Sequence, residues 1–248
     1  MHLTILGCGS IGSEKNCSSY LVKTKSGYIL MDIGPGAYSQ LIREKIPQEK
    51  IHTILITHTH VDHVNDLSAF LWRAMFGIKR KVPLTIIGPK RFKKFFGKLQ
   101  KIHLQIKEAK FQINIKELHN SKTSFSDGKI TAKQTLHSKY SNAYRIDSEE
   151  KSITYSGDTD YCKNIIQISK STDILILECS MPDDKKLSGH LSPELCGKIA
   201  HQSKAKSLVL VHLYPECEQI GEKYIIASVQ KRYKGKVIKG EDSIKIKI

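Results

Sequence analysis

Long apolar runs are absent from this 248-residue sequence. No stretch approaches the roughly 18 consecutive apolar residues of a membrane-spanning helix. The first ten residues, MHLTILGCGS, also lack the basic segment and the cleavage site of a secretion signal. We therefore expect a soluble cytoplasmic protein without a membrane partner.

Cysteine pairs with the spacing of metal or redox motifs are absent as well. The chain has six cysteines, with no CxxC arrangement and none of the density of small disulfide-rich secreted domains. We expect reduced thiols that behave mostly as small buried hydrophobic residues. They are Cys8, Cys17, Cys162, Cys179, Cys196 and Cys217.

Acidic residues are few. The chain has 24 Asp and Glu against 40 Lys and Arg, which gives a formal net charge of +16. Such a charge raises the local concentration of anionic ligands. It is mostly lysine, however, and a lysine-rich surface can simply reflect a lysine-rich or heat-adapted proteome. We weigh the two interpretations equally, so the charge allows a nucleic-acid partner without establishing one.

The hydrophobic content of 40% and the chain length suffice for one core, and no linker or repeat interrupts the sequence, so we expect a single domain, residues 1–248. Period-2 and short apolar runs predict strands at 3–6, 20–23, 28–31, 53–57, 84–87, 102–106, 111–118, 130–136, 143–146, 153–156, 174–177, 208–211 and 243–248. Period-3.6 patterns predict helices at 65–76, 161–169, 193–201 and 224–232, the third capped by Ser192. Two β-rich halves that each carry helices indicate two packed sheets with helices outside.

One glycine motif is misleading. Gly7, Gly9 and Gly12 have the GxGxxG spacing of a dinucleotide-binding fingerprint, and Asp32 follows at about the right distance for its ribose-binding acid. That fingerprint requires a helix that opens at the third glycine. Residues 13–19 are polar and unperiodic, so we reject a Rossmann domain.

The strongest chemical signal is the segment Thr-His-Thr-His-Val-Asp-His at a strand-to-helix boundary. Alternation along an extended chain sends His58 and His60 to one side, and the following turn can return Asp62 and His63 to the same point. A polar loop with satisfied histidines is the alternative, and it suits one isolated histidine better than four ligand-type side chains. The segment therefore predicts a metal site.

Three more ligand-type residues, His137, Asp158 and His212, each follow an apolar strand. Alone, each is more often structural. Together with the first segment they supply five histidines and two aspartates, enough for two divalent ions with open positions for water and substrate. Zinc fits these ligands best, and manganese or iron could use the same set.

The order of these motifs resembles that of the metallo-β-lactamase superfamily over nearly the whole chain. Its five motifs are matched in order by Asp32 in Met-Asp-Ile-Gly-Pro-Gly, the HxHxDH block, His137, Asp158 and His212. The resemblance implies an α/β (α+β) fold of four layers, αββα, with two sheets between helices.

The resemblance also implies a role for each motif residue. His58, His60 and His137 would bind one ion, Asp62, His63 and His212 the other, and Asp158 would bridge them. Asp32 would orient ligands through hydrogen bonds, although a turn residue before Gly34-Pro35-Gly36 explains it nearly as well.

Two further features are similar to ribonuclease Z. The stretch 141–146 follows His137 as in that branch, and Leu177-Glu178-Cys179 leads to Gly189-His190-Leu191-Ser192. In that branch a glutamate and a histidine at matching places cooperate, and the histidine is thought to protonate the leaving oxygen. This implies the same roles for Glu178 and His190. Alternatively, Glu178 simply ends a strand and His190 precedes a helix.

The transfer RNA-binding arm of ribonuclease Z has no room in this chain. Only about twenty residues separate His137 from Asp158, and two predicted strands occupy them. The sequence therefore resembles arm-less cyclic-nucleotide and cyclic-phosphate hydrolases of the same superfamily.

These features predict a metal-dependent hydrolase with a dinuclear site that cleaves a small anionic, nucleotide-type or cyclic phosphodiester. A hydroxide shared by two ions would attack phosphorus, Asp62 would orient it, and His190 would protonate the departing alkoxide. The alternative is hydrolysis of a lactone, thioester or β-lactam, because the same ions polarise a carbonyl. A non-catalytic nucleic-acid-binding protein is a third reading, against which the intact ligand set argues. The sequence leaves a homodimer open.

Overall fold

The computed structural model describes all residues, Met1–Ile248, and contains two seven-stranded sheets. The first has the order β14-β1-β2-β3-β4-β5-β6, and the second β13-β12-β11-β10-β9-β8-β7. The strands of the first are β1 (His2–Gly7), β2 (Ser19–Lys23), β3 (Tyr28–Met31), β4 (Ile51–Leu55), β5 (Leu84–Gly88), β6 (Ile113–Glu117) and β14 (Lys245–Lys247). Those of the second are β7 (Lys122–Phe125), β8 (Gly128–Gln134), β9 (Asn142–Ser148), β10 (Lys151–Tyr155), β11 (Ile174–Glu178), β12 (Ser207–Val211) and β13 (Lys236–Lys239).

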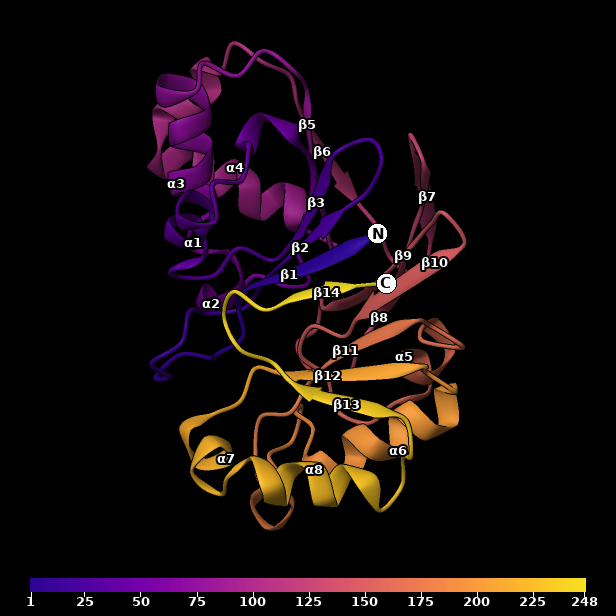
Figure 1. Cartoon of the computed structure of the whole chain (residues 1–248). Helices are drawn as coiled ribbons and strands as arrows, with labels where there is room; N and C mark the ends of the chain where they lie inside the picture. The colour runs from indigo at the N-terminus through magenta and orange to yellow at the C-terminus, as the bar shows by residue number, and fades with distance from the viewer.

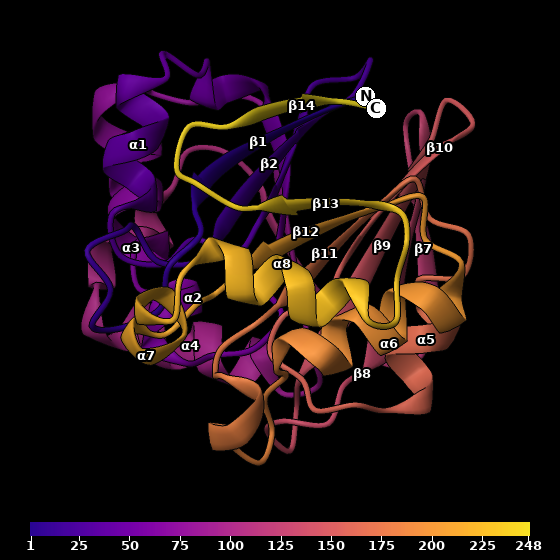
Figure 2. The ribbon, with the colours of Figure 1, turned by 60° about the horizontal axis from the view of Figure 1, so that its bottom comes forward.

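Helices cover the outer face of each sheet (Figures 1 and 2). The first sheet carries α1 (Ala37–Arg43), α3 (Leu67–Trp72) and α4 (Phe92–Ile102), and the second carries α5 (Lys163–Ile168), α6 (Pro193–Ser203) and α8 (Glu222–Gln230). Two short helices, α2 (Val61–Val64) and α7 (Pro215–Gln219), lie at one end of the sheets. The expected sandwich of two sheets with helices outside is confirmed.

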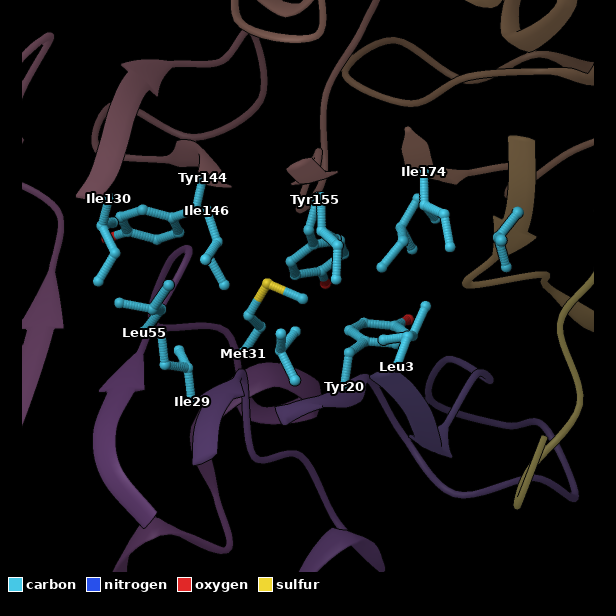
Figure 3. Close-up of a cluster of buried hydrophobic side chains, with 14 of the residues drawn as sticks. Leu3, Tyr20, Ile29, Met31, Leu55, Ile130, Tyr144, Ile146, Tyr155 and Ile174 are labelled. Carbon is cyan, nitrogen blue, oxygen red and sulfur yellow. The ribbon is translucent and has the colours of Figure 1, made fainter. Parts of the chain in front are cut away.

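The core between the sheets explains why the strands are apolar on both faces. Alternate residues of β2 serve different layers: Tyr20 and Val22 point between the sheets, whereas Leu21 packs against the outer helices. Tyr20 meets Tyr155 of the opposite sheet with ring centroids 4.6 Å apart (Figure 3). The core between the sheets contains residues of both halves of the chain, so it holds the two halves together.

Strand direction determines where functional side chains can gather. β3, β4, β5 and β6 run parallel, and so do β10, β11, β12 and β13. β8 points the same way as β10, since both pair antiparallel with β9. The segments that follow β4, β8, β10 and β12 therefore emerge at matching ends of the two sheets.

The predicted strand at 102–106 is wrong. Residue Ile102 ends α4, and a short helix, η3 (Leu104–Glu108), follows. The alternation of Ile102, Leu104 and Ile106 imitates a strand, but only Ile106 is buried. Phe92 and Phe96 have helical spacing and are both buried against the first sheet, and this burial favours a helix that continues to Ile102.

Two local predictions have mixed outcomes. The segment after Gly12 enters no helix and returns to β2, which agrees with the rejection of a Rossmann domain. Ser192 does precede α6 but makes no side-chain cap. The amide of Glu194 donates instead to Asp183 Oδ1 at 2.9 Å, so a distant aspartate replaces the local cap.

The cysteines agree with the expectation drawn from composition. All six cysteines are free thiols, and all but Cys162 are buried. None of the helices combines the length and the apolar character that crossing a membrane requires.

Candidate metal centre

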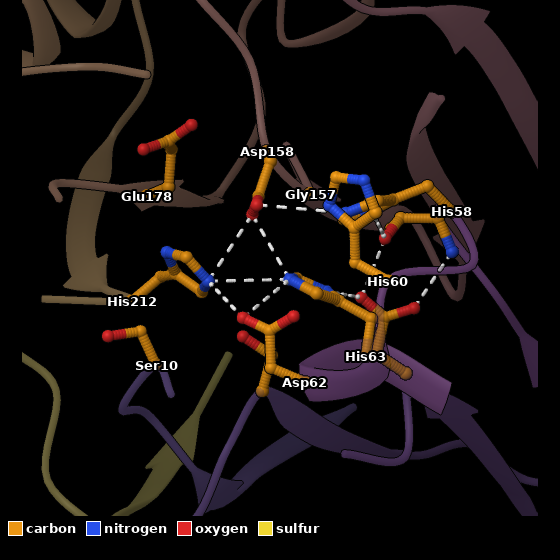
Figure 4. Close-up of polar contacts among 12 residues, drawn as sticks. Ser10, His58, His60, Asp62, His63, Gly157, Asp158, Glu178 and His212 are labelled. Atoms are coloured by element: carbon orange, nitrogen blue, oxygen red, sulfur yellow. Dashed lines mark hydrogen bonds and ion pairs between the residues drawn. The ribbon is translucent and has the colours of Figure 1, made fainter. Parts of the chain in front are cut away.

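Seven predicted ligand residues converge at one end of the sandwich. Figure 4 labels six of them, all except His137. They come from both sheets: the HxHxDH block follows β4 and runs into α2, whereas the other three residues follow β8, β10 and β12. They are His58, His60, Asp62, His63, His137, Asp158 and His212. The parallel strands thus bring together side chains that are up to 154 positions apart in the sequence (212 − 58).

Asp158 lies between two groups of side chains. Its Oδ2 is 3.7 Å from His58 Nε2 and 3.6 Å from His137 Nε2. Its Oδ1 is 3.2 Å from His63 Nε2 and 3.6 Å from His212 Nε2. Each carboxylate oxygen therefore faces a different pair of imidazoles.

The remaining residues complete these groups. His60 joins His58, His137 and Asp158, with one ligand-type atom of each lying within 4.8 Å of the others. Asp62 forms a second such set with His63 and His212, and its Oδ2 is 3.2 Å from His212 Nε2. The structure thus contains two adjacent sets of donor atoms, and Asp158 lies near histidines of both sets.

The donor atoms fit divalent ions by a direct test. His58 Nε2 and Asp158 Oδ1 are both buried without a hydrogen-bond partner, an arrangement that costs free energy unless a further group contacts each atom. The outer nitrogens of three histidines are instead engaged: His63 Nδ1 with Asp32, His137 Nδ1 with the Gly189 carbonyl and His212 Nδ1 with Ser180. Such outer contacts orient the inner nitrogens for coordination.

The electrostatics favour ionised carboxylates. Burial raises the pKa of Asp158, but His212 and His63 outweigh this and hold it well below its usual range. Burial also raises the pKa of Asp62, but the hydrogen bond with His212 and the charge of His63 outweigh this and lower the pKa to about 2. Burial and His63 also lower the pKa of His58. Ionised aspartates and a neutral histidine are the forms that bind metals.

Asp32 organises the base of the site. Its carboxylate accepts hydrogen bonds from the Thr57 amide at 2.8 Å, the Thr57 hydroxyl at 2.7 Å and the Tyr155 hydroxyl at 2.9 Å, and contacts His63 Nδ1 at 2.7 Å. It is fully buried and adopts a left-handed φ of 55°. A mere turn residue would not need these contacts, which favours the expected orienting role.

Glu178 and His190 form a pair beside the ligands. Glu178 is fully buried and accepts hydrogen bonds from the amides of Thr159 and Leu191, and its Oε2 is 3.1 Å from His190 Nδ1. Burial lowers the pKa of His190, but the hydrogen bond and charge of Glu178 raise it overall. The His190 ring lies 4.8 Å from that of His137, at the edge of the cluster.

Close backbone packing holds the HxHxDH loop in place. A Cβ on Gly34 would lie 2.0 Å from the carbonyl oxygen of Asp62, so only glycine fits there. The amide of Ile33 also donates to the His63 carbonyl at 2.8 Å. The loop after β3 therefore fixes the first turn of α2.

Ser180 is a contact residue that the sequence did not predict. Its hydroxyl donates to Glu178 and therefore accepts from His212 Nδ1 at 3.2 Å and His190 Nδ1 at 3.3 Å. Its position two residues after Glu178 was the only available signal. The contact assigns the proton of His212 to Nδ1 and leaves Nε2 free at the centre of the site.

Ser180→Ala should weaken metal binding about tenfold, because His212 loses the group that fixes its tautomer and ring orientation. Competition with a chromogenic chelator measures the affinity. Ser180→Thr retains the hydroxyl and is the matched control. Equal affinities for all three proteins would contradict the role of Ser180.

Comparisons with known proteins bear on this arrangement. The sequence matches the beta-lactamase superfamily domain over residues 28–213. The chain belongs to this superfamily. A relative within it, the probable metallo-hydrolase YhfI of Bacillus subtilis, is 28% identical over 221 residues, which cover 86% of this chain and 87% of YhfI. Ribonuclease Z of Saccharolobus solfataricus is 24% identical over 87% of this chain and 89% of its own length.

Solved structures of the superfamily show the same fold. The crystal structure of the metallo-beta-lactamase fold protein YhfI has a TM-score of 0.86 at 22% identity and covers 99% of this chain and 98% of its own. Human tRNase Z, short form, has a TM-score of 0.82 at 21% identity, with 100% and 99% covered. A diphosphatase of the PhnP family has a TM-score of 0.76 at 19% identity, with 100% and 97% covered. The four-layer αββα fold and the resemblance to ribonuclease Z are confirmed.

Proposed function

We propose that this member of the superfamily is a metal-dependent phosphodiesterase with a dinuclear site. The observation that carries the proposal is the placement of Asp158 between two ligand sets, with the Glu178–His190 pair beside them. One ion would be held by His58, His60 and His137, and the other by Asp62, His63 and His212. Asp158 would contact both, and zinc suits this donor set best.

The roles of the protein groups follow from their positions. Bound divalent ions would supply an activated water and neutralise charge on the phosphoryl oxygens. The Asp62 carboxylate accepts a hydrogen bond from the attacking water and so orients it. His190 donates a proton to the leaving oxygen, and Glu178 holds its ring and favours its protonated form.

A small nucleotide-type or cyclic phosphodiester suits this chain better than transfer RNA. Between His137 and Asp158 the chain contains only β9 and β10, joined by the two-residue turn Glu149-Glu150, which leaves no place for an inserted arm. Relatives that are ribonuclease Z or a PhnP-family diphosphatase support phosphorus chemistry in the superfamily. Since each ligand set draws on both sheets, we infer that residues 1–248 act as one unit.

His190→Ala should slow hydrolysis of bis(p-nitrophenyl) phosphate roughly a hundredfold or more, because the leaving oxygen loses its proton donor. Bound metal, counted by mass spectrometry in the same samples, should remain at the wild-type level. His201→Ala, at an exposed histidine on α6, is the matched control.

The same assay separates the alternatives. Unchanged turnover by His190→Ala would remove the assigned proton donor. A metal-loaded wild type that ignores the diester but opens a lactone or cleaves a thioester would replace phosphodiester chemistry with carbonyl chemistry. If the diester is cleaved, a screen of cyclic and linear nucleotides follows.

A further inference from the structure

The end of the molecule opposite the metal centre is apolar and basic. β4, β5 and β6 are parallel, so the connections 42–50, 73–82 and 101–110, which lead into them, meet at the starts of these strands. In Figure 1 the connection from α3 to β5 forms the top of the molecule, and α2, which carries Asp62 and His63, lies well below it. We call these three connections the distal end.

The distal end exposes large apolar side chains. Six of the eleven exposed large hydrophobic residues of the chain belong to the distal end or lie directly beside it, and Ile102 at 74% is the most exposed of them all. The six are Ile42, Trp72, Phe76, Val82, Ile102 and Leu104. Trp72 and Phe76 contact each other, with ring centroids 4.7 Å apart. Such gathering of apolar surface marks an interaction site rather than ordinary scatter.

Positive charge surrounds these apolar residues. Nine exposed lysines and arginines lie in the three connections, and none of them forms an ion pair with a carboxylate. Two exposed acids, Glu49 and Glu108, lie among them, and Glu44 is already paired with Lys245. From Leu67 to Lys107 the chain has no aspartate or glutamate, so all 24 acidic residues lie outside this stretch. The excess charge is therefore available to a polyanion.

Contacts join the three connections of the distal end to one another. Arg80 is buried and donates to the carbonyls of Gln48, Ile51 and Pro83, which joins the first connection to the second. A cavity of about 610 Å³, lined by residues of 75–81 and 108–111, lies where the second meets the third. Docking would need no rearrangement of the fold.

We propose that the distal end docks on an anionic lipid surface. Exposed tryptophan and aliphatic side chains beside unpaired lysines are the features of proteins that lie on the membrane interface. This departs from the expectation of no membrane partner, which was drawn from the lack of a membrane-spanning segment, because a surface contact needs no such segment. Nucleic acid is less suited, since Val82, Ile102 and Leu104 would gain nothing from phosphates, and the surface faces away from the metal centre. A second copy placed patch to patch would oppose like charges.

Co-sedimentation with phosphatidylcholine vesicles, with and without about one-third phosphatidylglycerol, tests this proposal. The wild type should bind only the anionic vesicles, and higher salt should weaken binding. Ile102→Ser/Leu104→Ser and Lys79→Glu/Lys81→Glu should each lose roughly tenfold or more in affinity. All four substituted side chains are exposed, so folding is preserved.

Matched controls lie on α8 and at its C-cap, Lys231, in the opposite helix layer. Lys223→Glu/Lys231→Glu changes the charge equally, and Tyr224→Ser removes an exposed aromatic ring; both should bind like the wild type. If these controls also lose binding, the distal end is not the specific docking surface, and the proposal is overturned. A wild type that does not bind anionic vesicles would also overturn the proposal. In that case, distal variants that lose binding to a single-stranded oligonucleotide would point to nucleic acid, and distal variants that dissociate a dimer would point to a second copy of the chain.

Discussion

Asp158→Ala should retain at most a trace of bound metal and hydrolyse bis(p-nitrophenyl) phosphate on the order of 1,000-fold more slowly than wild type. Both oxygens of this carboxylate face imidazoles, 3.2–3.7 Å away, in the two ligand sets. In the proposed site its removal would take a ligand from both ions, and it leaves four histidines without the one carboxylate that faces them all. The other carboxylate of the cluster, Asp62, contacts only the histidines of the second set.

Metal counting and turnover on the same samples measure the effect. Asp173→Asn is the control, because Asp173 directly precedes β11, at the strand end opposite the ligands, and forms an ion pair with Lys206. Asp158→Asn keeps the size of the side chain and one acceptor oxygen, and should rank between alanine and wild type in affinity. Full metal content in Asp158→Ala would contradict the assignment of Asp158 to both sets.

Asp32→Ala should lower the free energy of unfolding of the metal-free protein by about 3–5 kcal/mol. The substitution leaves the Thr57 amide, the Thr57 hydroxyl and the Tyr155 hydroxyl buried without their acceptor, and removes the partner of His63. Few single positions in the chain combine full burial with four contacts to one carboxylate. The effect on stability is thus larger than that of most point substitutions.

Urea titration in excess chelator isolates this effect from metal binding. Tyr155→Phe removes a single donor to Asp32 and should cost about 1 kcal/mol. Asp32→Asn tolerates the left-handed backbone but presents an amide group to donors, so it should fall between the two. A stability of Asp32→Ala equal to that of Tyr155→Phe would show that the network is not cooperative.

The ligand residues could be predicted because their signal is local. His58, His60, Asp62 and His63 lie within six consecutive residues, and each of the other three follows an apolar strand. Ser180 could not be predicted in this way. Its three contacts join the ends of β11 and β12 to the loop at His190, and only the folded chain shows that these segments meet.

The misassigned strand at 102–106 has a related cause. Alternating isoleucine and leucine predict a half-buried strand only if one face is covered, and in this protein Ile102 and Leu104 stay exposed. The buried phenylalanines of α4 decide the conformation, because they fill space against a sheet that the local sequence does not describe. The pattern of burial, and not the residue types, decides that this segment is helical instead of a strand.

Each ligand set combines side chains from both sheets, so an ion bound there would act as a clasp across the interface of the two halves. Ligand binding to the folded state alone stabilises that state by mass action, by about 2.7 kcal/mol at a free concentration 100 times the dissociation constant. The supply of metal would then determine the stability of the folded chain as well as its activity. The melting temperature should therefore fall in chelator, and Asp158→Ala should be insensitive to added zinc in the same thermal scan.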